Sequence, residues 1–151
     1  MTKVITVTRR NGDTHEVIVD KGFNYPGKIS ISASGHAVIT QNSKTIYLHR
    51  FILGVNKDCD LVVDHINRNP LDNRSENLRL ITKAENAINK ISKGYTFHKK
   101  TGKWNTKIKR GNKISSLGLY KTEEEAHEVY KKAHADYHKE LSPYYKEMVK
   151  R

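Results

Sequence analysis

Two capping-box motifs indicate where helices begin in this chain. Residues 82–85 (TKAE) and 122–125 (TEEE) each place a threonine hydroxyl three residues before a glutamate, the capping pattern of a helix N-terminus. After the second box, helical spacing of apolar residues predicts the longest helix, with a face of Ala126, Val129, Tyr130, Ala133 and Tyr137. Elsewhere short strands alternate with turns, so we expect an α+β protein built from small modules.

Residues 1–46 carry the pattern of a β-rich N-terminal region. An alternating segment at 4–8 is followed by Asn11-Gly12, which supplies the positive φ values of a tight hairpin turn. Residues 17–19 form the returning strand, and further short strands are expected at 28–32, 37–40 and 45–48. We find no functional motif before Tyr47.

Residues 47–92 follow a different order, which is strand, long loop, strand and helix. Residues 61–63 predict a short buried strand, and the turn-rich segment 67–77 predicts a polar loop. A second short strand is expected at 78–81, directly before the first capping box. The predicted helix that follows this box carries Asn86 on its first turns.

Four polar residues of this middle segment have the chemistry of phosphodiester hydrolysis. Asp64 and His65 close the first strand, Asn77 lies twelve residues beyond His65, and Asn86 lies nine further on. A histidine can act as the general base for water, and a divalent cation can neutralise the phosphate and the leaving oxygen. The oxygens of Asp64 and Asn86 suit Mg²⁺ or Mn²⁺, which prefer oxygen ligands. Asn77 can accept the far N–H of the His65 ring and so orient it.

Residues 93–151 return to alternation and are predicted to form a three-stranded antiparallel sheet packed on the long helix. Trp104, Thr106 and Ile108 are expected to face the helix, and Ser115, Leu117 and Leu119 are expected to share one face of the last strand. The outward side of this sheet is predicted to carry Asn105, Lys107 and Lys109, with Lys99, Lys100 and Arg110 nearby.

The charge of the chain favours a polyanionic partner. The net charge is +12, and residues 93–151 hold 15 Lys and Arg against 7 Asp and Glu. Cys59 is the single cysteine, which excludes an internal disulfide and a zinc site built from several thiolates. The sequence has no apolar run of membrane length. We therefore expect a protein that binds no membrane and acts in the cytoplasm of a bacterial or phage-infected host cell.

The middle segment resembles the HNH endonuclease family, in particular the small homing endonucleases of phages and introns. The matching residues, spread over residues 47–90, are Leu48-His49-Arg50-Phe51, Val63-Asp64-His65-Ile66-Asn67, Asn73, Glu76-Asn77-Leu78-Arg79, Ile81-Thr82 and Glu85-Asn86. The resemblance implies a ββα-metal motif in which Asp64 and Asn86 hold one metal ion. It makes His65 the general base and Asn77 the residue that orients it. Many relatives carry a third histidine where this chain has Asn86, a departure typical of the homing subgroup.

The C-terminal segment, residues 93–142, resembles the AP2/ERF DNA-binding domain. The matching residues are Gly102-Lys103-Trp104, Lys107-Ile108-Lys109, Leu117-Gly118-Leu119-Tyr120, Thr122-Glu123-Glu124-Glu125-Ala126 and Tyr130-Lys131-Lys132-Ala133. The resemblance implies that the sheet lies in the major groove of DNA. The residues then expected to contact DNA are Lys99, Lys100, Asn105, Lys107, Lys109 and Arg110. Lysines mainly contact phosphates, so Asn105 and Arg110 are the base-contact candidates. The outward face here is rich in lysine where the family has arginine, which puts tight sequence specificity in doubt.

Together these patterns predict an endonuclease that nicks or cleaves double-stranded DNA, and the resemblance to the HNH family implies 5′-phosphate and 3′-hydroxyl ends. It would need one Mg²⁺ or Mn²⁺ and no small-molecule cofactor, and it would act as a monomer or as a homodimer. The alternatives are a DNA-binding regulator with an inactive HNH module and a structural RNA-binding protein of ribosomal type. His49 is expected to pack or bridge, and His134 and His138 are expected on a solvated helix face.

Overall fold

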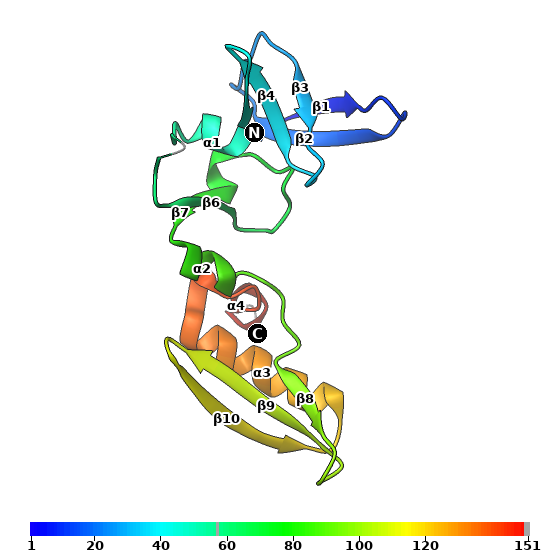
Figure 1. The fold of residues 1–151 in the computed structure, drawn as a ribbon, viewed down its shortest axis with the longest axis vertical. Helices are drawn as coiled ribbons and strands as arrows, with labels where there is room; N and C mark the ends of the chain where they lie inside the picture. Colours follow the sequence, from blue (N-terminus) through cyan, green and yellow to red (C-terminus); the bar gives the residue numbers. More distant parts are fainter. Residues whose placement is uncertain (57, 150–151) are drawn as a thin grey trace. The chain divides into compact units, whose positions relative to one another are not determined.

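A computed structural model describes residues 1–56 and 58–149 (Figure 1). It is a mixed α and β structure with several small antiparallel sheets, as the sequence predicted. The chain divides into two compact units, Met1–Lys83 and Ala84–Arg151. The boundary falls inside helix α2 (Lys83–Ile88), within the segment assigned to the nuclease module on sequence. No helix in the described part of the chain is long and apolar enough to cross a membrane.

The first unit is built from three small antiparallel sheets. Its strands are β1 (Thr2–Thr8), β2 (Thr14–Asp20), β3 (Ile29–Ile31), β4 (Ala37–Gln41), β5 (Lys44–Tyr47), β6 (Val62–His65) and β7 (Leu78–Ile81). Strands β1 and β2 form a hairpin, β3, β4 and β5 form a meander, and β6 pairs with β7. Helix α1 (Leu48–Ile52) follows β5 directly, and a 3-10 turn η1 (Ser75–Asn77) precedes β7.

One hydrophobic core joins the hairpin to the meander. Its buried members are Val7, Val17, Val19, Ala37, Ile39 and Leu48. Because side chains alternate between the faces of a strand, burial of Val17 and Val19 directs Ile18 and Asp20 to the opposite face of β2. The core therefore fixes the register of β2, since a shift by one residue would expose both valines.

The second unit is a three-stranded sheet packed on one long helix. Its elements are β8 (Tyr95–His98), β9 (Lys103–Arg110), β10 (Lys113–Tyr120), α3 (Glu123–His138), η2 (Lys139–Leu141) and α4 (Tyr145–Val149). The strand order is β10-β9-β8, with both pairs antiparallel. Helix α3 begins at the second capping box, where the Glu125 amide donates to the Thr122 hydroxyl at 3.2 Å.

The two faces of β9 are those that the alternation predicted. Thr106 and Ile108 are buried under α3, and the Thr106 hydroxyl donates to the Ala126 carbonyl at 3.3 Å. Trp104 is partly buried on the same side and meets the Phe97 ring edge-on. The outward residues of β9 therefore line the face that α3 leaves open.

In strand β10 one prediction, that Ser115, Leu117 and Leu119 share a face, is wrong. Its pairing with β9 shifts between Ser116 and Gly118, so a bulge interrupts the alternation. Ser115 pairs with the inward Ile108, whereas Leu119 pairs with the outward Asn105 and is 45% exposed. Ser115 and Leu119 consequently lie on opposite faces, where the sequence placed them on one.

In helix α3 the predicted exposure of one histidine is also wrong. His134, expected on a solvated face, is 5% exposed, and its Nδ1 lies 2.8 Å from the Ser142 hydroxyl. Tyr144, from the segment after the helix, meets the His134 ring edge-on and covers it. Tyr137, expected on the apolar face, is instead 48% exposed. The chain turns back after η2 and buries this histidine. The spacing of residues within the helix cannot predict that burial, because it depends on residues outside the helix.

Gly94 offers a test of how the second unit is packed. It has φ +70°, and a Cβ placed there would overlap the Tyr130 ring. Gly102 has φ +64° and open space around it, so it carries the backbone cost without the clash. Gly102→Ala should lower the free energy of unfolding by about 1–2 kcal/mol, the cost of a left-handed backbone. Gly94→Ala should lower it further, toward the ~4–5 kcal/mol of severe overpacking and strain. Chemical denaturation measures both, and equal losses would contradict the packing.

Candidate active site

The pairing of β6 with β7 places Asp64 beside Arg79. The two residues are cross-strand partners, and Arg79 Nε donates to Asp64 Oδ2 at 2.8 Å. A second guanidinium nitrogen lies 2.8 Å from the same oxygen. Both side chains are largely buried, so this charge-assisted pair fixes the orientation of the carboxylate. Arg79 is one of the residues that match the HNH family in sequence, but the sequence assigned it no role.

His65 follows Asp64 at the end of β6 and is also buried. Burial lowers the pKa of His65 below 6.5, because the protonated ring loses its hydration. A hydrogen bond with the Asn73 side chain raises the pKa, the nearby His36 lowers it, and Asp64 raises it. The net direction is downward, which leaves the ring neutral near pH 7 and able to accept a proton.

The Asn73 side chain lies beside the His65 ring and raises its pKa, and the role of Asn77 in orienting that ring stays a prediction. The Asn77 side chain bonds within the loop between the strands. Its Oδ1 accepts from the Asn67 amide at 3.0 Å, and its Nδ2 donates to Asn67 Oδ1 at 3.0 Å and to the Asp72 carbonyl at 2.8 Å. Asn73 was noted only as a match to the family, because spacing cannot tell which loop amide turns toward the ring.

Asp72 is the centre of a polar network that shapes the same loop. Its carboxylate accepts from Asn67 Nδ2 at 2.7 Å and from Arg74 Nε at 2.8 Å. The hydrogen bond with Arg74 lowers the pKa of Asp72, with burial opposing. Asx turns at Asn67 and Asn69 tighten the loop further. The asparagine-rich composition of the loop thus has a structural cause.

Three histidine rings meet at the candidate base. His49, on α1, lies edge-on to His65 at 5.1 Å between ring centroids, and His36 lies 6.1 Å from His65. His49 is buried, burial lowers its pKa to about 3, and its Nδ1 has no hydrogen-bond partner among the described residues. Tyr47 stacks on it at 5.3 Å. The structure thus places His49 as a packed neighbour of His65, and nothing in the sequence linked His36 to the site.

The end of β6 offers few side chains that could bind a cation. In residues 1–56 and 58–149, no group of three or more His, Cys, Asp or Glu side chains could hold a metal ion. Asp64 offers a buried carboxylate, which fits a hard cation that keeps water in most of its positions. Such an ion would share that carboxylate with Arg79. Asn86 lies on α2 in the second unit, so its part as a ligand stays a prediction.

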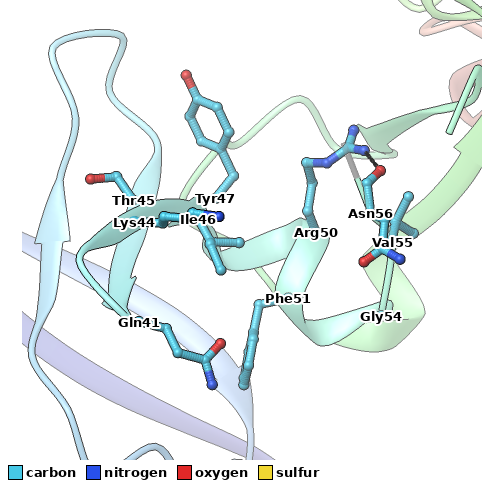
Figure 2. A pocket seen from close by; sticks show the side chains of 10 residues that line it. All are labelled: Gln41, Lys44, Thr45, Ile46, Tyr47, Arg50, Phe51, Gly54, Val55 and Asn56. Carbon is cyan, nitrogen blue, oxygen red and sulfur yellow. Dashed lines mark hydrogen bonds between the residues drawn. The ribbon is translucent and has the colours of Figure 1, made fainter. Parts of the chain in front are cut away.

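A pocket of about 790 Å³ adjoins the histidine cluster through Tyr47 (Figure 2). Its lining combines apolar and polar side chains, which are Gln41, Lys44, Thr45, Ile46, Tyr47, Arg50, Phe51, Gly54, Val55 and Asn56. Figure 2 shows the Arg50 guanidinium turned to the Asn56 carbonyl, to which it donates. Lys44 is exposed at the β4–β5 turn. Among the described residues the lining holds two cations and no carboxylate, which suits an anionic ligand.

The predicted DNA-contacting residues lie on the second unit. Lys107 and Lys109 are exposed on the open face of β9, and Asn105 is partly exposed there. Asn105 and Lys107 also line a hollow of about 310 Å³ together with Lys93 and Thr96. Lys99 and Lys100 are exposed in the turn between β8 and β9. Arg110 lies 5.2 Å above the Tyr137 ring, a cation–π contact that holds its guanidinium at the helix.

Part of the chain that includes this site matches a known nuclease family. Residues 57–88 match the family model described as HNH endonuclease. The matched segment contains all four residues selected on sequence, which are Asp64, His65, Asn77 and Asn86. No curated protein and no solved structure matches the chain. The family match supports an HNH nuclease with DNA as its substrate.

A carboxylate placed at position 73 or 77 tests which amide contacts His65. Asn73→Asp should raise the pKa of His65 by about 1 unit or more, because an opposite charge would then touch the protonated ring. Asn69→Asp, on the exposed part of the same loop, should leave it unchanged. The measurement is an NMR titration of the His65 ring. A larger shift in Asn77→Asp than in Asn73→Asp would support the sequence-based assignment.

Proposed function

We propose that this chain is a metal-dependent HNH endonuclease that nicks or cleaves double-stranded DNA. The observation that carries the proposal is a buried histidine of lowered pKa directly after a buried carboxylate, inside the segment that matches the HNH family. A neutral buried histidine is equipped to accept a proton at neutral pH. The adjacent carboxylate adds the negative charge that a cation site requires.

In the proposed reaction, His65 takes a proton from the attacking water at a ring nitrogen. The oxygen of that water forms a bond to phosphorus while the bond from phosphorus to the 3′ oxygen breaks. The leaving 3′ oxygen takes a proton from solvent, so the products are a 5′-phosphate and a 3′-hydroxyl. Asp64 and Asn86 would hold one Mg²⁺ or Mn²⁺, which supplies charge neutralisation at the phosphate and at the leaving oxygen.

Arg79 and Asn73 support the two reacting side chains. The Arg79 guanidinium keeps the Asp64 carboxylate oriented through its contacts to Oδ2. Asn73 contacts the His65 ring and so limits its rotation. Groups that fix a base and a ligand in place reduce the reorganisation needed during the reaction.

The second unit would provide the main grip on DNA. Lys107 and Lys109 project from the open face of β9, where they suit phosphate contacts that do not depend on sequence. Asn105, on the same face, is the base-contact candidate, and Arg110 reaches DNA only if it leaves Tyr137. A face with one amide and mainly lysines suits a preference for certain sites and not tight specificity, and the homing type is proposed from the family resemblance alone. One active site per chain makes nicking the expected outcome for a monomer.

Cleavage of supercoiled plasmid tests the proposal. The wild type should give open-circular or linear DNA with Mg²⁺ or Mn²⁺ and none with EDTA. His65→Ala and Asp64→Ala should abolish cleavage while DNA binding remains. His127→Ala, which removes a histidine of the second unit, is the matched control and should cleave normally.

The same assay on the chain's own native locus separates an enzyme from a regulator. A site-specific nuclease cuts that DNA even where random plasmid stays intact. Binding to the locus with no cleavage under any metal condition would identify a DNA-binding regulator with an inactive HNH module.

Substitution of the β9 lysines tests the proposed grip. Lys107→Gln and Lys109→Gln should each weaken binding to all duplexes alike and lower the slope of log K against log salt by about 1. Lys132→Gln is the matched control, because Lys132 is exposed on α3 rather than on the open sheet face. Equal effects of the three substitutions in fluorescence anisotropy would argue against this face.

A further inference from the structure

We propose that the N-terminal hairpin is part of the nuclease and that Asp20 is a positioning residue for His65. Asp20 would act through Ser75 on the loop that carries Asn73 against the histidine ring. The inference rests on the proposed function, and it assigns a role to residues 1–46, in which the sequence showed no functional motif.

The first contact is a backbone junction between β2 and the loop. The Ile18 amide donates to the Leu71 carbonyl at 2.8 Å, and the Asn73 amide donates to the Ile18 carbonyl at 2.7 Å. Ile18 and Asp72 form a parallel bridge at this point. The loop is therefore attached to β2 in the manner of an added strand, directly beside Asn73.

The second contact is made by the Asp20 carboxylate. Its Oδ2 accepts from the Ser75 amide at 2.9 Å and from the Ser75 hydroxyl at 2.6 Å. These bonds lower the pKa of Asp20, the hydroxyl bond most strongly. The carboxylate thus caps the 3-10 turn η1, which begins at Ser75. Hydrogen bonds to an ionised acceptor are stronger than neutral ones, so this is a firm anchor.

The two anchors lie on either side of the residue that contacts His65. Asn73 is held between Ile18 and Ser75, and its side chain is 0% exposed. Directly after His65, the Ile66 amide donates to the Asn77 carbonyl at 2.9 Å. A shift of the loop would therefore move both the partner of the ring and the backbone that follows it.

The hairpin is a rigid base for these contacts. Val17 and Val19 are fully buried in the core, so β2 cannot slide without exposing them. Ile18 meets the loop through its backbone at the edge of β2, and the Asp20 side chain alternates with these valines and lies on the opposite face. Packing of the hydrophobic core in this way fixes the position of the Asp20 side chain.

The sign of the Asp20 charge separates a positioning role from a DNA-binding role. A carboxylate opposes the binding of a polyanion, so its removal should leave DNA affinity unchanged or increase it. Loss of the anchor should instead reduce turnover, because a displacement of about 1 Å can cost about 100-fold in rate. A fall in kcat without a rise in KM is thus the expected signature.

The experiment compares Asp20→Ala, Ser75→Ala and the double variant with Asp13→Ala in the full chain. Asp13 lies at the other end of the hairpin and bonds with Asn11, so it is the matched control. We expect kcat to fall about 10-fold or more in both single variants. The double variant should be no slower than either one, and Asp13→Ala should match the wild type. Asp20→Asn keeps an acceptor oxygen and should recover part of the activity.

Two measurements keep the inference separate from the proposed function. Thermal unfolding gives the folded fraction, and a kcat loss that only follows this fraction would overturn the positioning role. The ¹⁵N signals of the His65 ring need no activity. They should shift in Asp20→Ala and Ser75→Ala and stay in place in Asp13→Ala. If the wild type cleaves no DNA the proposed function fails, whereas unshifted ring signals would overturn the role of Asp20 alone.

Discussion

The candidate active site depends on the hydrogen bonds that hold the loop between β6 and β7. That loop buries polar side chains beside His65, and burial of a polar group is unfavourable unless it is paired. Asp72 meets this requirement with Asn67 and Arg74, and Asn77 meets it with Asn67 and the loop backbone. Asn73 belongs to the same loop and lies beside the histidine. The bonds that fix the shape of the loop therefore also set the surroundings of the candidate base.

The first unit shows how a small chain can support such a site. Its core is small and consists mainly of valine, alanine, isoleucine and leucine from the hairpin and the meander. The strands β6 and β7 add only a short two-stranded sheet, which is marginal by itself in water. The backbone junction at Ile18 links that sheet's loop to the core. The N-terminal strands thus supply the rigidity that the nuclease segment lacks on its own.

Local patterns predicted much of the fold, and tertiary contacts decided the rest. Capping at residues 122–125 and alternation in β9 were sufficient because each depends on neighbours in sequence. The bulge in β10 was missed because one extra residue reverses the face of Leu119 without altering composition. His65 and Asp64 could be selected from their position after a buried strand. The position of Asn73 beside the ring could not, because spacing does not distinguish the amides of a loop whose shape depends on its attachment to β2.

The proposed chemistry requires a cation at the end of β6 beside His65. Paramagnetic broadening by Mn²⁺, followed in the amide spectrum of the full ¹⁵N-labelled chain, detects such an ion. We expect the signals of Asp64, His65 and Asn86 to broaden first and Asp64→Asn to remove this effect. Broadening centred on the pair His134 and His138, or broadening unchanged by Asp64→Asn, would contradict the proposed cation site.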